Sequence, residues 1–523
     1  MAVAMLIRQI RLHITFGVST QPWEYVMLVK DLLRKLDLGN SVAEFDSDLR
    51  SYFVETQTFR ALVKGDVDIV AGDKGTGKTA LYKVLRDRYR ELPDLEHVEI
   101  IPAFNPAGNP VFQRLGQIEI LTEGQYTTVW KSYFLSLVGN WLLEIVGGLD
   151  TDNLKQLHET LTRIGLRSSD DSAGTVFSKL VNLINRLLHP TSAEVGLSVT
   201  EAGMPVLTQK LEFGQAEAID KQQEIVHHED AFATLNACLA DLGVTVWVAL
   251  DRLDEAFQGY PNVERPALRA LLRTYLDLLE FDYLKLKLFV RKDLFRKVVQ
   301  GGFVNLTHVN AKRLDIVWDE EDLKALLCNR IRRDADFVPS FGVSATSDDD
   351  VFNLLFPPQV DSGPRKPITW AWMMSRIRDG NGIRPPRNLV DLAKKAQEAQ
   401  QRAEDRNARE FQIGSALIEP DSLRKALQRL SDDRVNDTLL AEAAELAPMV
   451  ERFRDGKAEH NATTLAALLS VSVDEVKAVA KPLIELGFLE EIGDVFKVPM
   501  LYRDGLNITQ GKAYSSDVPS SEE

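Results

Sequence analysis

A glycine-rich segment with the pattern G-x-x-x-x-G-K-T constrains the fold of this chain more than any other feature. It follows the apolar run Val67–Ala71 and leads into the helix-forming segment Ala80–Leu85. A strand, a glycine loop and a helix in this order surround a triphosphate with backbone N–H groups at a helix N-terminus, whose partial positive charge favours anions. The alternative is a glycine-rich turn that caps a helix and binds nothing. The predicted phosphate-binding residues are Gly72, Asp73, Lys74, Gly75, Thr76, Gly77, Lys78 and Thr79.

Each polar residue at the end of this loop has a specific expected role. We expect the Lys78 ammonium to reach the β- and γ-phosphates, and the Thr79 hydroxyl to hold Mg²⁺. The sequence therefore predicts ATP as ligand and Mg²⁺ as the accompanying ion.

Apolar strands and helices alternate along the first two thirds of the chain, which is typical of a parallel α/β sheet. Ligands bind at the carboxyl ends of the strands in such sheets, where Gly72–Thr79, Asp251 and Arg291 fall. The predicted strands are Asp66–Ala71, His97–Phe104, Val244–Leu250, Leu286–Val290 and Leu314–Val317.

A carboxylate opposite Thr79 is needed to hold Mg²⁺, and a further acid is needed to orient or deprotonate the attacking water. Asp251 ends the buried strand Val244–Leu250 and is the predicted Mg²⁺ ligand. Asp254 and Glu255 follow one helical turn later and are the predicted catalytic acids, with Asp254 slightly preferred. The alternative is an exposed acidic loop after an ordinary buried strand.

Two arginines are candidates for contact with the phosphates. Arg291 lies just past the strand Leu286–Val290, where a basic side chain can sense the γ-phosphate. The segment Arg384–Leu389 places Arg387 at the start of a helix, from which it can clamp the phosphates and neutralise charge in the transition state. Structural salt bridging is the alternative for either side chain.

Composition bounds the class of protein. No apolar run approaches the roughly 20 residues of a membrane helix, and Met1–Ile7 lacks a signal-peptide cleavage site. Cys238 and Cys328 are the two cysteines, each in an apolar helical context. We therefore expect a cytoplasmic protein with reduced, buried thiols and no membrane contact. Histidines form no metal-ligand spacing, so no metal other than nucleotide-bound Mg²⁺ is expected.

The chain is long enough, at 523 residues, for about three domains by the usual length prior. Glu194–Thr200 and Pro205–Phe213 alternate apolar and polar residues, which suggests a β-hairpin within an insertion. The predicted units are an N-terminal helical segment (1–60), an α/β core (61–333) with an insertion at about 105–230, a helical lid with a connecting helix (334–409), a winged-helix domain (410–510) and a disordered acidic tail (511–523).

The predicted winged helix consists of three helices and a tight hairpin. Its helices are Leu439–Phe453, Thr463–Leu469 and Val473–Leu486, and its hairpin strands are Phe488–Ile492 and Val495–Val498. The third helix would read bases, but it offers only Lys477 and Lys481 against three acids: Asp474, Glu475 and Glu485.

Affinity for duplex DNA comes largely from cationic contacts to phosphate, and the net charge of the whole chain is −15. The charge of the chain therefore does not support DNA binding. We give a protein partner at least the same weight as DNA. Lys497 and Arg503, on the predicted wing, keep DNA as an option.

These motifs together resemble the AAA+ and STAND group of P-loop ATPases. The motifs are Gly72–Thr79, Leu250–Glu255, Leu288–Arg291 and Arg384–Leu389, with the terminal winged helix. Tyr52–Thr56 followed by Gly72–Leu81 is also similar to a little-characterised bacterial P-loop ATPase family, often linked to phage defence or mobile elements. The resemblance implies an α/β P-loop NTPase core with a parallel sheet, a helical lid and a C-terminal winged-helix domain.

The resemblance also implies a function and an assembly. It implies a Mg-ATP-hydrolysing switch or motor that controls a partner protein or a DNA complex, with a role in anti-phage defence. It further implies a homo-oligomer in which a neighbour's arginine completes the site, with Arg296 and Arg313 as candidates by position. The acid pair after Asp251 is displaced relative to ordinary AAA+ modules, as in STAND proteins.

Three alternatives stay open from the sequence. One is a nucleotide-gated scaffold that binds ATP and assembles with little or no turnover. Another is an origin-recognition-like DNA-binding ATPase. A kinase using the same loop is the weakest, because no acceptor-substrate site is identifiable.

Overall fold

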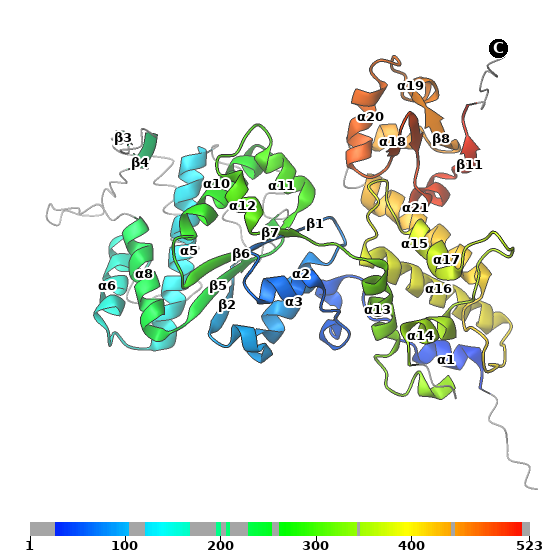
Figure 1. Cartoon of the computed structure of the whole chain (residues 1–523), viewed down its shortest axis with the longest axis horizontal. Helices are drawn as coiled ribbons and strands as arrows, with labels where there is room; N and C mark the ends of the chain where they lie inside the picture. Colours follow the sequence, from blue (N-terminus) through cyan, green and yellow to red (C-terminus); the bar gives the residue numbers. More distant parts are fainter. Residues whose placement is uncertain are drawn as a thin grey trace, which may run out of the picture.

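The chain forms two bodies joined by extended segments (Figure 1). The computed structural model describes residues 27–103, 121–167, 195–199, 205–209, 228–253, 261–341, 346–440 and 445–514. The first body contains the central sheet and its helices. The second contains α1 (Val29–Lys35) and the helices and small sheet that follow β7 (Arg313–Asp315). No helix in the described ranges combines the length and apolar character that a membrane span requires.

The central sheet has five parallel strands in the order β2-β5-β6-β1-β7. Besides β7, the strands of this sheet are β1 (Ile69–Gly72), β2 (Val98–Pro102), β5 (Thr245–Leu250) and β6 (Leu284–Arg291). The predicted parallel α/β core is therefore confirmed, with all five predicted strands present. Gly72 pairs in register with Arg291, and Leu250 pairs with Leu288. The carboxyl ends of β1, β5 and β6 thus meet at one edge, as expected.

Alternate residues of the strands enter two separate hydrophobic clusters, because successive side chains point to opposite faces of a sheet. Ile69 and Ala71 pack into a cluster with α5 (Glu123–Val146), α8 (His228–Leu242) and α10 (Pro261–Leu278). On the opposite face, Val70 packs into a second cluster with α2 (Gln57–Val63) and α3 (Lys78–Arg88).

Aromatic residues of α5 occupy the first cluster, as their spacing predicts. Trp130, Tyr133 and Phe134 are fully buried, and Trp130 Nε1 donates to Ala267 O of α10 at 2.8 Å. The predicted hairpin is also present, with β3 (Val195–Val199) antiparallel to β4 (Pro205–Gln209). Further helices in the described part of this body are α6 (Asp152–Arg163), α11 (Lys292–Val299) and α12 (Leu306–Ala311).

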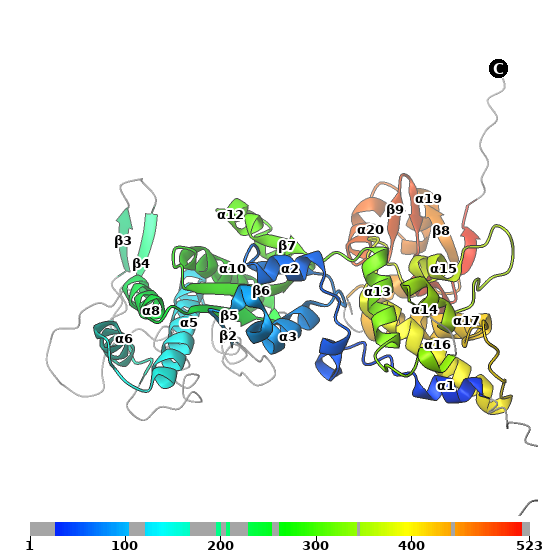
Figure 2. The same cartoon turned by 60° about the horizontal axis from the view of Figure 1, so that its bottom comes forward.

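The second body has one continuous hydrophobic cluster, which extends from Val29 in α1 to Ile508 near the end of the chain. The predicted lid and the predicted winged helix share this core. Figures 1 and 2 both place α1 beside α16, and Val29 N donates to Arg409 O at 3.0 Å. Its larger helices are α13 (Glu320–Ile331), α14 (Asp348–Leu355), α15 (Thr369–Arg376), α16 (Pro386–Arg406) and α17 (Pro420–Asp433).

The C-terminal part of the second body contains the predicted order of helices followed by a hairpin. Its elements are α18 (Ala447–Glu451), β8 (Lys457–Asn461), α19 (Ala462–Leu469), α20 (Val476–Glu485), β9 (Glu490–Ile492), β10 (Val495–Lys497), α21 (Met500–Arg503) and β11 (Thr509–Lys512). β9 and β10 form the predicted hairpin, within a four-stranded sheet of order β11-β8-β10-β9. The sequence prediction missed β8, β11 and α17.

Three predicted segments differ from the structure. The sequence predicts an irregular segment at Asp334–Lys366, but this segment contains α14, whose start at Ser347 is fixed by a capping box with Asp350. The helix predicted at Leu439–Phe453 is described only in part: a π-helical segment, Arg434–Leu440, reaches its start, α18 lies within it, and residues 441–444 lie outside the described residues. The sequence predicts a helix over Asp46–Leu62, but the chain is α-helical only from Gln57, where the Thr56 side chain caps α2, after short 3₁₀ turns at Ala43–Phe45 and Leu49–Ser51. The five-unit division of the chain stays a proposal.

Two described segments cross between the bodies. The first, residues 36–56, runs from α1 to α2, and the second, residues 316–319, runs from β7 to α13. Asp319 begins α13 by accepting a hydrogen bond from Asp322 N at 2.6 Å. Both segments pass the carboxyl edge of the central sheet, where the glycine loop lies.

Candidate nucleotide site

The glycine loop joins a central strand to a helix N-terminus, since β1 ends at Gly72 and α3 begins at Lys78. Gly75 and Gly77 have φ angles of +76° and +98°, which strain any residue with a side chain. A Cβ on Gly72 would lie 2.5 Å from Thr76 Oγ1. The glycines at these positions therefore have a conformational requirement, and the loop backbone stays open for close approach by a ligand.

Side chains hold three carbonyl groups of the loop. Lys78 Nζ donates to Gly72 O at 2.9 Å and to Asp73 O at 3.0 Å. Thr76 Oγ1 donates to Asp73 O at 2.7 Å, and Trp318 Nε1 donates to Thr76 O at 2.8 Å. The loop is thus held in shape by its own residues and by one residue of the segment that leads to α13.

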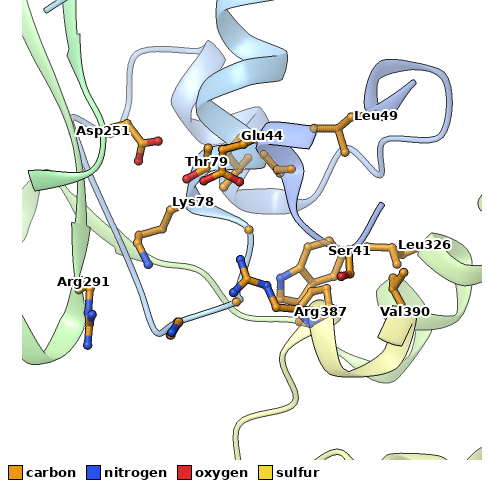
Figure 3. Close-up of a pocket in the computed structure, with 18 of the residues that line it drawn as sticks. Ser41, Glu44, Leu49, Lys78, Thr79, Asp251, Arg291, Leu326, Arg387 and Val390 are labelled. Carbon is orange, nitrogen blue, oxygen red and sulfur yellow. The ribbon is translucent and has the colours of Figure 1, made fainter. Parts of the chain in front are cut away.

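Asp251 and Thr79 lie side by side at the edge of the sheet (Figure 3). Asp251 follows β5 and is 5% exposed. Burial raises the pKa of Asp251 to about 6, although a hydrogen bond with the Thr79 side chain and the charge of Lys78 act in the opposite direction. A hydroxyl and a buried carboxylate are hard oxygen ligands of the kind that Mg²⁺ prefers, so these two residues fit the ion.

Asp254 and Glu255, the predicted catalytic acids, lie outside the described residues. Their assignment stays a prediction. Leu253, the last described residue before them, is buried in the first cluster.

A second carboxylate at this site was missed by the sequence analysis. Glu44, from the first crossing segment, lies beside Thr79 (Figure 3) and forms an ion pair with Arg252 at 2.8 Å. Burial raises the pKa of Glu44, but the hydrogen bond and charge of Arg252 outweigh it and hold the pKa below its ordinary value. Arg252 itself has a φ of +59°. No local pattern around Glu44 signals this role, since its partners come from distant segments.

Arg291 ends β6, at the edge of the sheet predicted from its position. It lines a cavity that Lys78 and Asp251 also line. Its guanidinium donates to both oxygens of Asp293, from Nε at 3.0 Å and from Nη2 at 2.8 Å. Burial raises the pKa of Asp293, but the hydrogen bonds and charge of Arg291 outweigh it and lower the pKa overall. The Arg291 guanidinium that faces the cavity is therefore already paired with the Asp293 carboxylate.

Arg387 reaches the glycine loop from the second body. It is the second residue of α16, and a Cβ on Gly75 would lie 3.3 Å from Arg387 Cβ and from Pro385 Cβ. Its Nε is buried and has no hydrogen-bond partner within the described ranges. Burial and the neighbouring Arg434 cation lower the pKa of Arg387. A buried guanidinium of this kind is an anion-binding group.

The neighbouring Arg384 has a different environment. Its Nε donates to Met374 O at 3.3 Å, and its Nη2 lies 3.4 Å from Glu320 Oε1. These contacts hold the start of α16 against α15 and α13. Of the two arginines in this segment, Arg387 is the one that lines the cavity.

The glycine loop, the strand ends and the second body enclose a cavity of about 800 Å³, within the size range of small-molecule sites. The polar groups that line it include Lys78, Thr79, Asp251 and Arg387. Apolar residues also line it, and we call them the apolar wall: Leu49, Phe53, Val54, Trp318, Leu326 and Val390. The sequence analysis missed this wall, because each contributing segment is short and distant from the others.

The two arginine-finger candidates are not among the residues that line this cavity. Arg313 is paired with Asp315 at 2.7 Å and stacks on Phe295, with Cζ 4.4 Å from the ring centroid. Arg296 is exposed on α11. The assignment of a finger stays a prediction.

Two lysines of the C-terminal part lie close to acids of the same chain. Lys477 lies 3.5 Å from Glu491, and Lys497 lies 3.3 Å from Glu459. Arg503, which we predicted as a wing residue, is instead 6% exposed in α21 and donates to Val498 O. It follows β10, is buried and also donates to Gln510 Oε1, so it does not present a free charge to DNA.

The cysteines and the possible metal-binding side chains complete the description of the site residues. Cys238 and Cys328 are both buried. Within the described ranges, no group of three or more His, Cys, Asp or Glu side chains is arranged to hold a metal ion.

The chain matches no described protein family and no curated protein. Among solved structures it is similar to a Walker-type ATPase, PABY2304, of Pyrococcus abyssi, with 11% identity, coverage of 91% of this chain and 100% of that chain, and a TM-score of 0.40. It is also similar to the ORC2 protein of Aeropyrum pernix in its ADPNP–ADP complexes, with 14% identity, coverage of 88% and 97%, and a TM-score of 0.36.

A third similar structure is the ORC1 protein of Aeropyrum pernix in complex with DNA. It has 14% identity, covers 91% of this chain and 96% of that chain, and gives a TM-score of 0.32. At such low identities and TM-scores, the assignment of the site rests on the geometry of this chain alone.

Proposed function

We propose that this chain binds ATP with Mg²⁺ and hydrolyses it, and that it acts as a molecular switch. One observation carries the proposal. A lysine, a hydroxyl, a buried carboxylate and a buried arginine converge from three segments on one cavity, namely Lys78, Thr79, Asp251 and Arg387. This set matches the positioning and electrostatic groups that phosphoryl transfer requires.

Each group has a separate role in the proposal. The loop N–H groups and Lys78 bind the phosphates, while Thr79 and Asp251 hold the ion. When bound, Mg²⁺ neutralises charge on the phosphate oxygens. Arg387 reaches the phosphates from the second body and stabilises charge that develops on them. Asp254 or Glu255 orients the attacking water and takes its proton.

The apolar wall supports a nucleotide as the ligand. Leu49, Phe53 and Val54 come from the first crossing segment, and Leu326 and Val390 come from the second body. A flat base in this part of the cavity would bury apolar surface from both bodies, while its phosphates lie on the loop. We propose ATP as the nucleotide, and competition by GTP tests the choice of base.

The position of the cavity supports a switch. Its walls include both segments that cross between the bodies, so the ligand touches every described link between them. Because the second body has one continuous hydrophobic cluster, we propose that its lid helices and C-terminal part move together. Loss of the γ-phosphate removes a partner of Arg387 and releases this body relative to the sheet.

The structure also bears on the partner class. The pairing of Lys477 and Lys497 with acids, together with the burial of Arg503, favours a protein partner over duplex DNA. We propose that the C-terminal part is a winged helix that contacts protein. Self-association through a shared site, with Arg296 or Arg313 as the arginine, and a role in phage defence remain part of the proposal. Plating efficiency of phages on cells with and without the intact gene tests the last.

The alternatives are a nucleotide-gated scaffold and an origin-recognition-like DNA-binding ATPase. A measurement of ATP turnover distinguishes the scaffold from the proposed ATPase. We expect wild-type protein to release phosphate from Mg-ATP, and Asp254→Asn protein, Glu255→Gln protein or the double variant to bind ATP but release phosphate far more slowly. Tight ATP binding with no turnover, with or without DNA, supports the scaffold. Turnover unchanged in the double variant would place the catalytic base elsewhere.

A further inference from the structure

We propose that Trp318 is a positioning residue that presets the Gly77 N–H group for a phosphate oxygen, and that it does so from the joint between the two bodies. The inference rests on the proposed nucleotide binding and assigns a role to a residue outside the glycine loop. Trp318 touches the loop but is not itself a phosphate ligand.

The location of Trp318 is unusual in this fold. It lies in the crossing segment between β7 and α13, one residue before Asp319, which caps α13. Its indole packs against the cluster that holds α2 and α3 and also against the cluster of the second body. It lines the nucleotide cavity as well. Trp318 therefore contacts the sheet body, the second body and the loop at once.

The hydrogen bond of Trp318 fixes the orientation of one peptide group in the loop. Trp318 Nε1 donates to Thr76 O at 2.8 Å. Since a trans peptide is planar, the carbonyl of Thr76 and the N–H of Gly77 point in opposite directions. Holding the carbonyl on the indole side turns the Gly77 N–H away from the indole N–H and toward the inside of the loop, where the proposed phosphate would bind.

The conformation of Gly77 makes this restraint useful. Gly77 has a φ of +98°, and glycine visits both signs of φ readily, so its peptide group has little intrinsic preference. The indole ring lies close beneath it, since a Cβ on Gly77 would lie 3.8 Å from Trp318 Cζ2. A donor that is already oriented loses less entropy when it binds an oxygen. Removing the indole N–H should therefore weaken phosphate binding specifically.

A role as a stacking platform for the base is the competing explanation, because the ring also lines the cavity. The two roles differ in the ligand that they affect. Orientation of Gly77 acts on any polyphosphate, whereas stacking acts only on ligands with a base. Trp318→Phe removes the N–H donor and keeps an aromatic ring, so it isolates the first role.

Trp372 provides a matched control. It is 2% exposed in α15, and its Nε1 donates to Asp361 Oδ2 at 3.2 Å. Trp372→Phe thus removes a similar indole hydrogen bond from the second body without touching the cavity.

The experiment compares Mg-ATP and inorganic tripolyphosphate with Mg²⁺ as competitors of a fluorescent ATP analogue, using full-length wild type, Trp318→Phe and Trp372→Phe. We expect Trp318→Phe to weaken both competitors by the same factor, about tenfold for one misoriented hydrogen bond to a charged group. Trp372→Phe should stay within about twofold of wild type, by the same reasoning on hydrogen-bond strength. Thermal melts report folding, and Trp318→Leu gives the same ligand comparison if the phenylalanine variant is unstable.

Several results would overturn the inference. One is unchanged tripolyphosphate affinity in Trp318→Phe, and another is an equal loss in Trp372→Phe. A third is wild-type protein that binds Mg-ATP while tripolyphosphate fails to compete, since the loop N–H groups would then not supply phosphate affinity. Wild-type protein that binds no nucleotide would instead reject the proposed function itself.

Discussion

The Thr79 side chain lies beside the Asp251 carboxylate (Figure 3), although the two residues belong to different parts of the sequence. Thr79 lies in the first turn of α3, after β1, and Asp251 follows β5. β6 separates these two strands in the sheet, and the parallel register brings their carboxyl ends to one level. The pair forms a hard oxygen site at the point where the glycine loop enters its helix.

We predict that Asp251→Asn removes the Mg²⁺ dependence of nucleotide binding and lowers turnover at least about a hundredfold, because the amide keeps the shape of the side chain and loses its charge. Nucleotide affinity measured without Mg²⁺ should change little. Asp241→Asn, at an exposed position on α8, is the control. A Mg²⁺ titration of turnover that is the same in Asp251→Asn and wild type would contradict the assignment.

Arg387→Ala should weaken ATP more than ADP, because its guanidinium lies at the loop from the second body and is proposed to contact the outer phosphates. We expect a loss of about ten- to a hundredfold for ATP, the usual effect of removing one charged hydrogen-bond donor. The control is Arg402→Ala on the same helix, where the side chain is exposed and its nearest acid, Glu398, is 4.0 Å away. Equal losses for ATP and ADP in calorimetric titrations would place Arg387 elsewhere on the ligand.

Asp379 should make the free energy of unfolding depend on pH. Burial raises the pKa of Asp379 from 3.8 to about 6, against hydrogen bonds from Ile383 N and Asn381 N. Because the pKa is higher in the folded protein, protonation favours folding. The penalty for the buried charge is absent below about pH 4 and complete above about pH 6.

Asp379→Asn keeps an acceptor for both N–H groups, which bind the same oxygen, Oδ1. We predict that it raises the free energy of unfolding by about 1–2 kcal/mol at pH 8 and has no effect at pH 4. Denaturant unfolding of wild type and variant at the two pH values measures this difference. A gain of equal size at both would show that charge is not the cause.

DNA binding by the full-length chain should be weak at physiological salt and should require ATP or a partner. The predicted reading helix presents Lys477 and Lys481, each close to an acid of its own chain, at 3.5 Å and 3.9 Å. Cationic contacts to phosphate supply most duplex affinity, and these charges are already shared. Anisotropy titrations with and without ATP check the prediction, and sub-micromolar affinity without nucleotide would refute it.

The parts of the site that sequence could predict are those whose signal is local. The pattern of Gly72–Thr79 is enough to predict a phosphate-binding loop. The apolar strand before Asp251 identifies that residue without knowledge of the residues that surround it in the fold. The parallel sheet could also be predicted, because each buried strand is a continuous apolar run between helices, but the order of its strands was not predicted.

The rest depended on contacts between distant segments. Glu44 meets Arg252, Trp318 meets Thr76, and the apolar wall of the cavity collects single residues from several elements. None of these pairs has a spacing that a linear pattern can reveal. Arg503 was misplaced for the same kind of reason, because it lies in α21 and its buried side chain donates to Val498 O.

Titration of Mg-ATP into purified wild-type and Lys78→Ala protein tests the central claim most directly. Lys155→Ala, an exposed lysine of α6 paired only with Asp152 at 3.2 Å among the described ion pairs, controls for loss of a positive charge. We predict that wild type and Lys155→Ala bind Mg-ATP with the same affinity, and that Lys78→Ala, although folded, loses tight binding because its ammonium meets the phosphates directly. Unchanged affinity in folded Lys78→Ala protein would contradict the account.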